Sequence, residues 1–487
     1  MSDKYHTTTV IRHATVYTGE LNDSFIGDVA IGDDKIVALG DCQHLYSDND
    51  VDGTGLVLTP GFIDVHTHDD LEVLRNPNML CKVSQGVTTV IAGNCGISSV
   101  PYVEEIDPVD PINLLGQKAD FKYPNLADFR DAFDKLKPSV NLAQLIGHTS
   151  LRAQVMSDLS RPASENEINA MQGLLKTQME QGALGLSTGL AYPNAKASSS
   201  DEVAKLAEQV TPFNGLYTTH LRTEFQGIID AMDEAFSTAK KANLPLVISH
   251  LKCAGIDNWG RAQEVLQHLE NNRKSQPACC DCYPYSASSS TLDLNQVTDK
   301  TDIYITWSTP HPEMAQRTLA DIAQAWQLSL MQAAEKLMPA GAVYHCMLED
   351  DVKQFLSYDN SMIGSDGLPC DPHPHPRLWG TFPRVLGHYA RDENTLSLAL
   401  AIHKMTALPS RRFKLRKRGK IAKGYFADLV LFDANTIIDN ACYQNPKAQA
   451  EGIKQVWVNG IVSFAEGLNE MSVKRYGRAG RFLARGE

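Results

Sequence analysis

The chain has 487 residues, of which 43% are hydrophobic and 21% are charged, as in a folded protein of two or three structural units. Its 45 basic and 58 acidic residues give a net charge of −13, which argues against non-specific binding to nucleic acid or to an anionic membrane. Because it shows no export signal and no membrane-spanning apolar stretch, we expect a cytoplasmic protein whose ten cysteines are reduced.

Short β-like segments occupy both ends of the chain, and turn residues separate them. They cover residues 8–17, 28–39, 55–58, 427–432, 455–458 and 461–464. The last two flank Asn459-Gly460, which is a hairpin signal. We expect residues 1–58 and 410–487 to form one small, sandwich-like β-domain built from both termini.

Between these ends, apolar runs alternate with amphipathic stretches. Eight runs have the pattern of buried strands, at residues 61–66, 86–92, 142–147, 183–187, 216–220, 244–250, 278–283 and 361–366. Helical patterns lie between them, at 125–136, 164–181, 201–212, 227–242 and 261–271. This alternation predicts an α/β fold, a (β/α)8 barrel over residues 59–409. The gap after the seventh strand is much longer than the others, so we expect residues 287–345 to form an inserted subdomain or lid.

His66 and His68 follow the first of these strands. Alternate residues of a strand point to the same face, so the two imidazoles should project together and could hold a divalent metal. Such a pair is a weak signal when it stands alone. Here the ends of other strands carry further candidate ligands.

In a barrel of this kind the active site lies where the strands end. Cys95 follows the second strand, His220 and His250 end the fifth and sixth, and Asp366 ends the eighth. Each of these residues could be structural by itself. It is improbable that all were placed at strand ends by chance. Mixed cysteine and histidine ligands indicate zinc.

These motifs resemble those of the amidohydrolase superfamily and, within it, the D-aminoacylases, which are N-acyl-D-amino-acid deacylases. The resemblance covers most of the chain and is carried by PGFIDVHTH (60–68), SQGVTTV (84–90), GNCGIS (93–98), SHLK (249–252), IGSDGLP (363–369) and HPHPRLWGTFP (373–383). Many superfamily members carry a metal-bridging lysine on the fourth strand. Residues 183–189 contain none, and Cys95 is the natural replacement.

The resemblance implies a metal-dependent hydrolase that cleaves the linear amide bond of N-acyl-D-amino acids, a small-molecule substrate. It implies that Cys95, His220 and His250 hold one zinc ion tightly. His66, His68 and Asp366 would form a second, weaker metal site. The sequence predicts no oligomeric state.

We expect Asp366 to be the catalytic carboxylate, which takes a proton from water and delivers it to the leaving nitrogen. The substrate carries a free carboxylate that needs cations and hydroxyls. The resemblance implies that this carboxylate is bound by Tyr192, Lys252, Tyr283 and Arg377. Ser289, within a run of three serines, is a candidate donor near the scissile group.

The loop after the seventh strand bears on the substrate side chain. Residues 290–299 contain no cation that could pair with an acidic side chain, so we expect neutral or hydrophobic side chains. Two alternatives remain open. One is a cyclic-amide hydrolase of the dihydropyrimidinase kind, against which the missing strand-four lysine counts. The other is a non-catalytic relative, which should have lost ligands.

Overall fold

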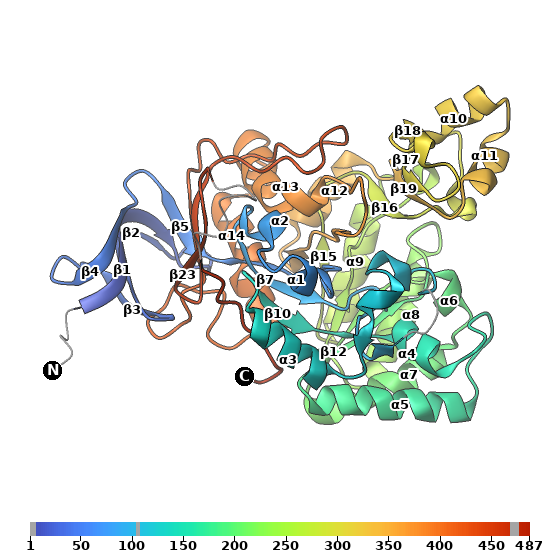
Figure 1. Cartoon of the computed structure of the whole chain (residues 1–487), viewed down its shortest axis with the longest axis horizontal. Helices are drawn as coiled ribbons and strands as arrows, with labels where there is room; N and C mark the ends of the chain where they lie inside the picture. The colour runs from blue at the N-terminus through green and yellow to red at the C-terminus, as the bar shows by residue number, and fades with distance from the viewer. Residues whose placement is uncertain (1–5, 104–107, 468–476) are drawn as a thin grey trace.

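The computed structural model describes residues 6–103, 108–467 and 477–487. A barrel of parallel strands and helices forms the centre of the molecule (Figure 1). A β-domain lies at one end of the long axis, and a small subdomain projects at the other. This confirms the predicted α/β fold, with a β-domain from both termini and an insertion after the seventh strand.

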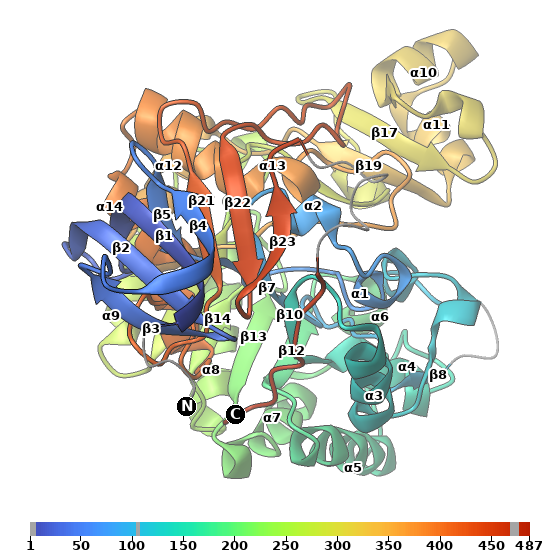
Figure 2. The same cartoon turned by 60° about the vertical axis from the view of Figure 1, so that its left-hand side comes forward.

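Strands from both ends of the chain form a single eight-stranded sheet. They are β1 (His6–Tyr17), β2 (Ser24–Gly32), β3 (Lys35–Gly40), β4 (Tyr46–Asp52), β5 (Val57–Pro60), β21 (Leu429–Phe432), β22 (Ile453–Val458) and β23 (Ile461–Ala465). β5 and β21 pair antiparallel and join the N-terminal and C-terminal strands, which lie side by side in Figure 2. Buried Ile11, Leu58 and Trp457 form part of its core.

The barrel strands all pair in parallel. They are β6 (Phe62–Asp64), β7 (Val87–Ala92), β10 (Asn141–Gln144) with β11 (Ile146–Gly147), β12 (Gly185–Gly189), β13 (Leu216–His220), β14 (Leu246–Ile248), β15 (Ala278–Cys282) and β20 (Ser361–Ile363). β10 and β11 together occupy the third position, so these nine strands form a barrel with eight strand positions. Two sheets, β10-β7-β6 and β11-β12-β13-β14-β15-β20, make up the wall. A parallel bridge between Thr67 and Gly367 links the first and eighth positions.

Helices surround this wall. Five of them lie at or near the predicted positions: α3 (Leu126–Leu136), α5 (Glu165–Glu180), α7 (Ser200–Glu208), α8 (Ile228–Lys241) and α9 (Ala262–Arg273). Four further helices were not predicted: α4 (His148–Val155), α12 (Glu349–Ser357), α13 (Arg377–Arg384) and α14 (Leu398–Met405). Asn125 and Ser164 cap α3 and α5, as helix-start signals predict. Apolar side chains such as Ile63, Ile91 and Met362 fill the barrel interior, so the barrel is a packed core and not a channel.

The insertion has its own small sheet. Strands β16 (Ser288–Thr291), β17 (Ile303–Ser308), β18 (Arg317–Thr318) and β19 (Ala340–Tyr344) pair antiparallel in the order β16-β19-β17-β18. Helices α10 (Leu319–Trp326) and α11 (Leu330–Leu337) lie between β18 and β19. The predicted domain boundaries, which are residues 287–345 for the insertion, 59–409 for the barrel and 1–58 with 410–487 for the β-domain, remain predictions.

The last described segment, residues 477–487, runs along the barrel. The amide of Leu142 on β10 donates to the carbonyl of Arg481 at 3.0 Å, and the amide of Leu483 donates to the carbonyl of Leu142 at 2.7 Å. In the described parts of the chain, no helix is both long and apolar enough to cross a membrane.

A buried polar network fastens the β-domain to the barrel. Asp428, next to β21, accepts hydrogen bonds from the amide of Asn459 at 2.8 Å and from Nδ2 of Asn141 at 3.2 Å. Asp428 also forms an ion pair with buried Arg418. Asn459 in turn donates to Oδ1 of Asn141 at 2.7 Å. Because Asn141 lies on β10, this network connects the two domains directly.

Replacing Asp428 should therefore destabilise the whole chain. Asp428→Ala leaves the buried guanidinium of Arg418 without its counter-charge, and breaking such a pair costs about 3–5 kcal/mol. We expect a clear fall in the midpoint of denaturant unfolding. The matched control is Asp48→Ala, an exposed aspartate of the same domain, which should change stability by less than about 0.5 kcal/mol. Equal midpoints for the two variants would contradict the assigned role of the network.

Candidate metal centre

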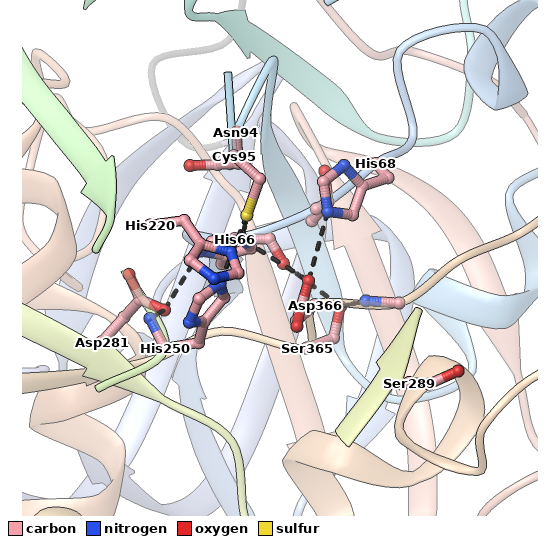
Figure 3. A network of polar contacts seen from close by, with 12 residues as sticks. His66, His68, Asn94, Cys95, His220, His250, Asp281, Ser289, Ser365 and Asp366 are labelled. Atoms are coloured by element: carbon pink, nitrogen blue, oxygen red, sulfur yellow. Dashed lines mark hydrogen bonds and ion pairs between the residues drawn. The ribbon is translucent and has the colours of Figure 1, made fainter. Parts of the chain in front are cut away.

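The barrel brings all six predicted metal ligands to one buried point. They form two overlapping groups, one of His66, His68, Cys95 and Asp366, and one of Cys95, His220 and His250. The ligand atoms within each group lie within 4.8 Å of one another. Figure 3 shows the side chains pointing toward this common centre. They come from the ends of β6, β7, β13, β14 and β20. Cys95 belongs to both groups, so its sulfur could be a ligand for a metal held by either group.

Short distances link the two groups. Sγ of Cys95 lies 3.2 Å from Nε2 of His66 and 3.2 Å from Nε2 of His250. Oδ1 of Asp366 lies 3.2 Å from Nε2 of His68 and 3.5 Å from Nε2 of His66. Sulfur and imidazole nitrogen in one buried set are donors that borderline-soft divalent metals prefer. The residues present therefore fit a metal centre.

Three of these residues have a left-handed backbone. φ is 53° at Cys95, 34° at His250 and 49° at Asp366, a conformation that costs about 1–3 kcal/mol for a residue with a side chain. Hydrogen bonds hold two of them in place. The amide of His250 donates to Oδ1 of Asp281 at 2.9 Å, and the amide of Asp366 donates to the carbonyl of His66 at 2.8 Å. The fold thus maintains strain to aim these side chains inward.

Electrostatic interactions decide the protonation of the cluster. Burial would raise the pKa of the Cys95 thiol, but the neighbouring charges of His66 and His250 hold it well below its ordinary value. Burial would lower the pKa of His68 and of His250, yet nearby anionic groups raise both to about 9. Without metal, protons therefore sit on the imidazoles beside an anionic sulfur. A divalent cation would bind these atoms in place of the protons.

Two carboxylates face the outer sides of the histidine rings. Oε1 of Glu224 lies 2.9 Å from Nδ1 of His250, and its Oε2 lies 3.7 Å from Nε2 of His220. Oδ1 of Asp281 lies 3.2 Å from Nδ1 of His66. Such outer partners fix the orientation and tautomer of a ligand histidine.

Neither Glu224 nor Asp281 was predicted from the sequence, although both carry a signal. Asp281 is a carboxylate within the buried strand β15, where an unpaired charge would be costly. Glu224 follows His220 by four residues in the loop after β13. A buried acid near a ligand histidine could have marked both residues.

A buried lysine ties the first and eighth strands together beside this cluster. Nζ of Lys82 lies 2.8 Å from Oδ2 of Asp64, 3.2 Å from Oδ2 of Asp69 and 3.0 Å from Oγ of Ser365. Oδ1 of Asp64 accepts a hydrogen bond from the amide of Ser365 at 2.8 Å. The residue before Asp366 is thereby held to the strand that carries His66 and His68.

The predicted substrate-binding residues line the same end of the barrel. The ring of Tyr192 lies 5.1 Å from that of His220, and the ring of Tyr283 lies 6.5 Å from that of His250. The Tyr283 hydroxyl is buried and has no hydrogen-bond partner among the described residues. A phenolic donor next to the cluster is therefore available to a ligand.

Both predicted cations are engaged with carboxylates. Nη1 of Arg377 lies 3.0 Å from Oδ2 of Asp366, and its Nη2 donates to the carbonyl of Ser289 at 3.1 Å. Nζ of Lys252 lies 2.6 Å from Oε1 of Glu224. Ser289 lies on β16, to one side of the ligand cluster in Figure 3, so the insertion contributes to this rim.

Comparison with known sequences relates this chain to one family of hydrolases. A model of the amidohydrolase family matches residues 51–281 and 334–464. The chain is 43% identical to a D-aminoacylase of Alcaligenes xylosoxydans xylosoxydans, over 90% of each chain. It is 42% identical to an N-acyl-D-aspartate deacylase of the same organism, over 93% of this chain and 91% of that one.

Solved structures agree with the sequence comparison. A crystal structure of a D-aminoacylase superposes with a TM-score of 0.95 at 41% identity, covering 98% of this chain and all of the other. An N-acyl-D-glutamate deacylase from Bordetella bronchiseptica superposes with a TM-score of 0.94 at 37% identity, with the same coverage. A dihydropyrimidinase from Brevibacillus agri, at 16% identity and a TM-score of 0.60, shares the fold alone. The chain therefore belongs to the amidohydrolase family and, within it, to the D-aminoacylases, the N-acyl-D-amino-acid deacylases.

Proposed function

We propose that this chain hydrolyses the amide bond of N-acyl-D-amino acids and releases a D-amino acid and a carboxylate. The observation that carries the proposal is the group of buried Cys95 and His250 with half-buried His220 at the ends of three barrel strands. Further support comes from the Bordetella bronchiseptica deacylase, which was solved with zinc and a phosphonate that mimics a tetrahedral reaction intermediate. Separate assays of N-acetyl-D-amino acids and their L-enantiomers test the proposal, because only the D-forms should be hydrolysed.

The metal is zinc in this proposal, and Cys95, His220 and His250 hold it tightly. His66, His68 and Asp366 form a second, weaker site. A study of a D-aminoacylase with a TM-score of 0.95 to this chain describes a binuclear centre with one-metal activation and second-metal attenuation. That description supports two sites of unequal affinity. When bound, zinc supplies Lewis-acid chemistry that polarises a carbonyl and makes water more acidic.

Asp366 is the acid–base residue. Burial would raise the pKa of its carboxyl, but Arg377, His68 and His66 hold it well below the usual value, so Asp366 is ionised. A substrate carboxylate that binds Arg377 competes with Asp366 for the guanidinium. The basicity of Asp366 would then rise when substrate arrives, which favours proton uptake from water and delivery to the leaving nitrogen.

The substrate carboxylate is bound at the rim by Arg377, Lys252, Tyr283 and Tyr192. Arg377 can bind it through two parallel hydrogen bonds, and Lys252 acts as a point charge. The buried hydroxyl of Tyr283 gains a partner in this way. Ser289, whose buried Oγ has no partner among the described residues, is the candidate donor near the scissile group.

The preferred side chain is neutral or hydrophobic. Leu292, in the stretch after β16, is 3% exposed and packs into the main core. Lys300 is the first cation after β15, and its Nζ pairs with Oδ2 of Asp257 at 2.7 Å on the surface. An acidic side chain would therefore meet no free cation in this stretch. We also propose a cytoplasmic location, which suits ten free cysteines, eight of them buried.

The first prediction concerns the tight metal. Cys95→Ala removes the thiolate of the group, so we expect the variant to lose both its zinc, about one per chain, and its activity. Metal analysis after dialysis, with a hydrolysis assay, measures both. Cys442→Ala, at an exposed cysteine, is the matched control and should keep both. A Cys95→Ala variant with full zinc content would show that this assignment is wrong.

The second prediction separates proton transfer from metal binding. Asp366→Asn keeps the shape of the side chain but cannot take a proton, so kcat should fall by about 10²-fold or more. Zinc content at the tight site should stay at the wild-type level, because Asp366 is outside that group. A variant with near-normal kcat would move the acid–base role to another residue.

The third prediction concerns substrate choice. We expect kcat/KM for N-acetyl-D-methionine to exceed that for N-acetyl-D-glutamate by at least about tenfold, equivalent to about 1.4 kcal/mol, because an acidic side chain would lose water without gaining a cation. Steady-state assays of the two substrates side by side decide this. Equal or reversed values would refute the preference.

A further inference from the structure

Glu224 occupies an unusual place behind the tight metal site. Its two oxygens face different histidines, Oε1 toward Nδ1 of His250 at 2.9 Å and Oε2 toward Nε2 of His220 at 3.7 Å. Sγ of Cys95 lies on the opposite edge of the His250 ring, 3.2 Å from Nε2. One carboxylate therefore stands behind both imidazoles of the Cys95, His220 and His250 group.

The position of Glu224 is fixed from three directions. Glu224 is 8% exposed, and its Oε1 accepts a hydrogen bond from Nζ of Lys252 at 2.6 Å. Its carbonyl accepts hydrogen bonds from the amide of Ala254 at 2.9 Å and from Nδ2 of Asn258 at 3.0 Å. The loop after β13 is thus tied to the loop after β14. His220 ends β13 and His250 follows β14. The hydrogen bonds between the two loops therefore fix the imidazole rings of His220 and His250 relative to each other.

We propose that Glu224 is a positioning residue for the tight metal site, one that orients the imidazoles of His220 and His250 and increases the zinc affinity of the group. The inference rests on the assignment of the tight site in the proposed function. Nδ1 of His250 lies 2.9 Å from Oε1 of Glu224 and 2.8 Å from Nζ of Lys252. In this proposal Glu224 accepts the proton on Nδ1 and leaves Nε2 to bind the cation. For His220, Glu224 faces Nε2 and leaves Nδ1, which has no hydrogen-bond partner among the described residues.

The second candidate site is supported less completely. His66 has Asp281 at 3.2 Å from its Nδ1, but Nδ1 of His68 is buried and has no hydrogen-bond partner among the described residues. A ligand histidine without an outer acceptor is held in orientation less firmly and is a poorer electron donor. By ion-pair distance, both histidines of the tight site but only one of the second site face a carboxylate, and this difference would favour unequal affinities.

The test compares zinc dissociation constants by competition with a chelator of known affinity. Glu224→Gln keeps the size of the side chain but removes its charge, so we expect the tight site to bind zinc about 10- to 100-fold more weakly. The matched control is Glu234→Gln, which also removes a paired carboxylate, here one 2.8 Å from Nη2 of Arg222 and outside the metal group. The control should bind zinc within about threefold of the wild type.

Thermal unfolding of the metal-free forms separates positioning from general stability. If Glu224→Gln unfolds earlier but binds zinc within threefold of the wild type, Glu224 is only structural and the proposal is overturned. If zinc affinity falls while metal-free stability stays close to that of the control, the proposal is supported.

Lys252→Met provides a second, independent variant. It removes the Nζ group that lies 2.6 Å from Oε1 of Glu224 and 2.8 Å from Nδ1 of His250, but it leaves the carboxylate facing both rings. If the carboxylate orients the rings, zinc affinity should stay within about threefold of the wild type while KM rises. A loss of zinc affinity as large as that of Glu224→Gln would show that the ion pair, and not the carboxylate–imidazole contact, supports the site, and would overturn the proposal. Hydrolysis of N-acetyl-D-methionine by the wild type is measured in the same preparation. Its absence in a zinc-loaded chain would refute the proposed function and leave the role of Glu224 standing.

Discussion

The structure depends on holding several charged groups together in a place without water. A thiolate, a carboxylate and four imidazoles share one buried point, and charge in such a place is stable only when it is paired. Arg377 supplies a cation to Asp366, and Glu224 and Asp281 supply anions to the histidines. Four of the six inner groups, His66, His220, His250 and Asp366, thus have an outer partner of opposite charge.

The ligand side chains must also approach the neighbouring backbone closely, which explains the glycines beside the cluster. A Cβ atom at Gly364 would lie 2.5 Å from Cβ of His66, and one at Gly189 would lie 2.1 Å from the carbonyl oxygen of Cys95. Both contacts are shorter than real carbon atoms tolerate. The ligand side chains can meet only because the neighbouring strands lack side chains at these points.

Much of this arrangement could be predicted because it depends on local patterns. The strands that carry His220 and His250 read as apolar runs bounded by turn residues, and α5 begins at a Ser164 cap with Glu167 three residues later. The positions of the six candidate ligands then followed from the rule that active sites lie at strand ends.

The outer partners could not be predicted in this way, because loop paths determine them. Lys252 was expected to be free for substrate, whereas in the fold it already contacts Glu224. Glu224 and Lys252 are 28 residues apart in the sequence, so their contact depends on how two loops approach each other. Neither the spacing of hydrophobic residues nor the helix-capping residues contains information about the paths of these loops. Lys82, for which we made no prediction from the sequence, is fully buried between strands one and eight.

The division of the barrel wall into two sheets has a consequence for the lifetime of the fold. Each candidate metal group draws ligands from both sheets. In the tight group, Cys95 follows β7 of one sheet, while His220 ends β13 and His250 follows β14 of the other. A bound cation would therefore connect the two sheets near the bridge between Thr67 and Gly367. A ligand that binds only the folded form stabilises that form. The gain is about 4 kcal/mol when the free ligand concentration is a thousand times the dissociation constant. Metal supply would then govern how long the chain survives as well as how fast it works, and resistance to a protease should decline in step with metal occupancy.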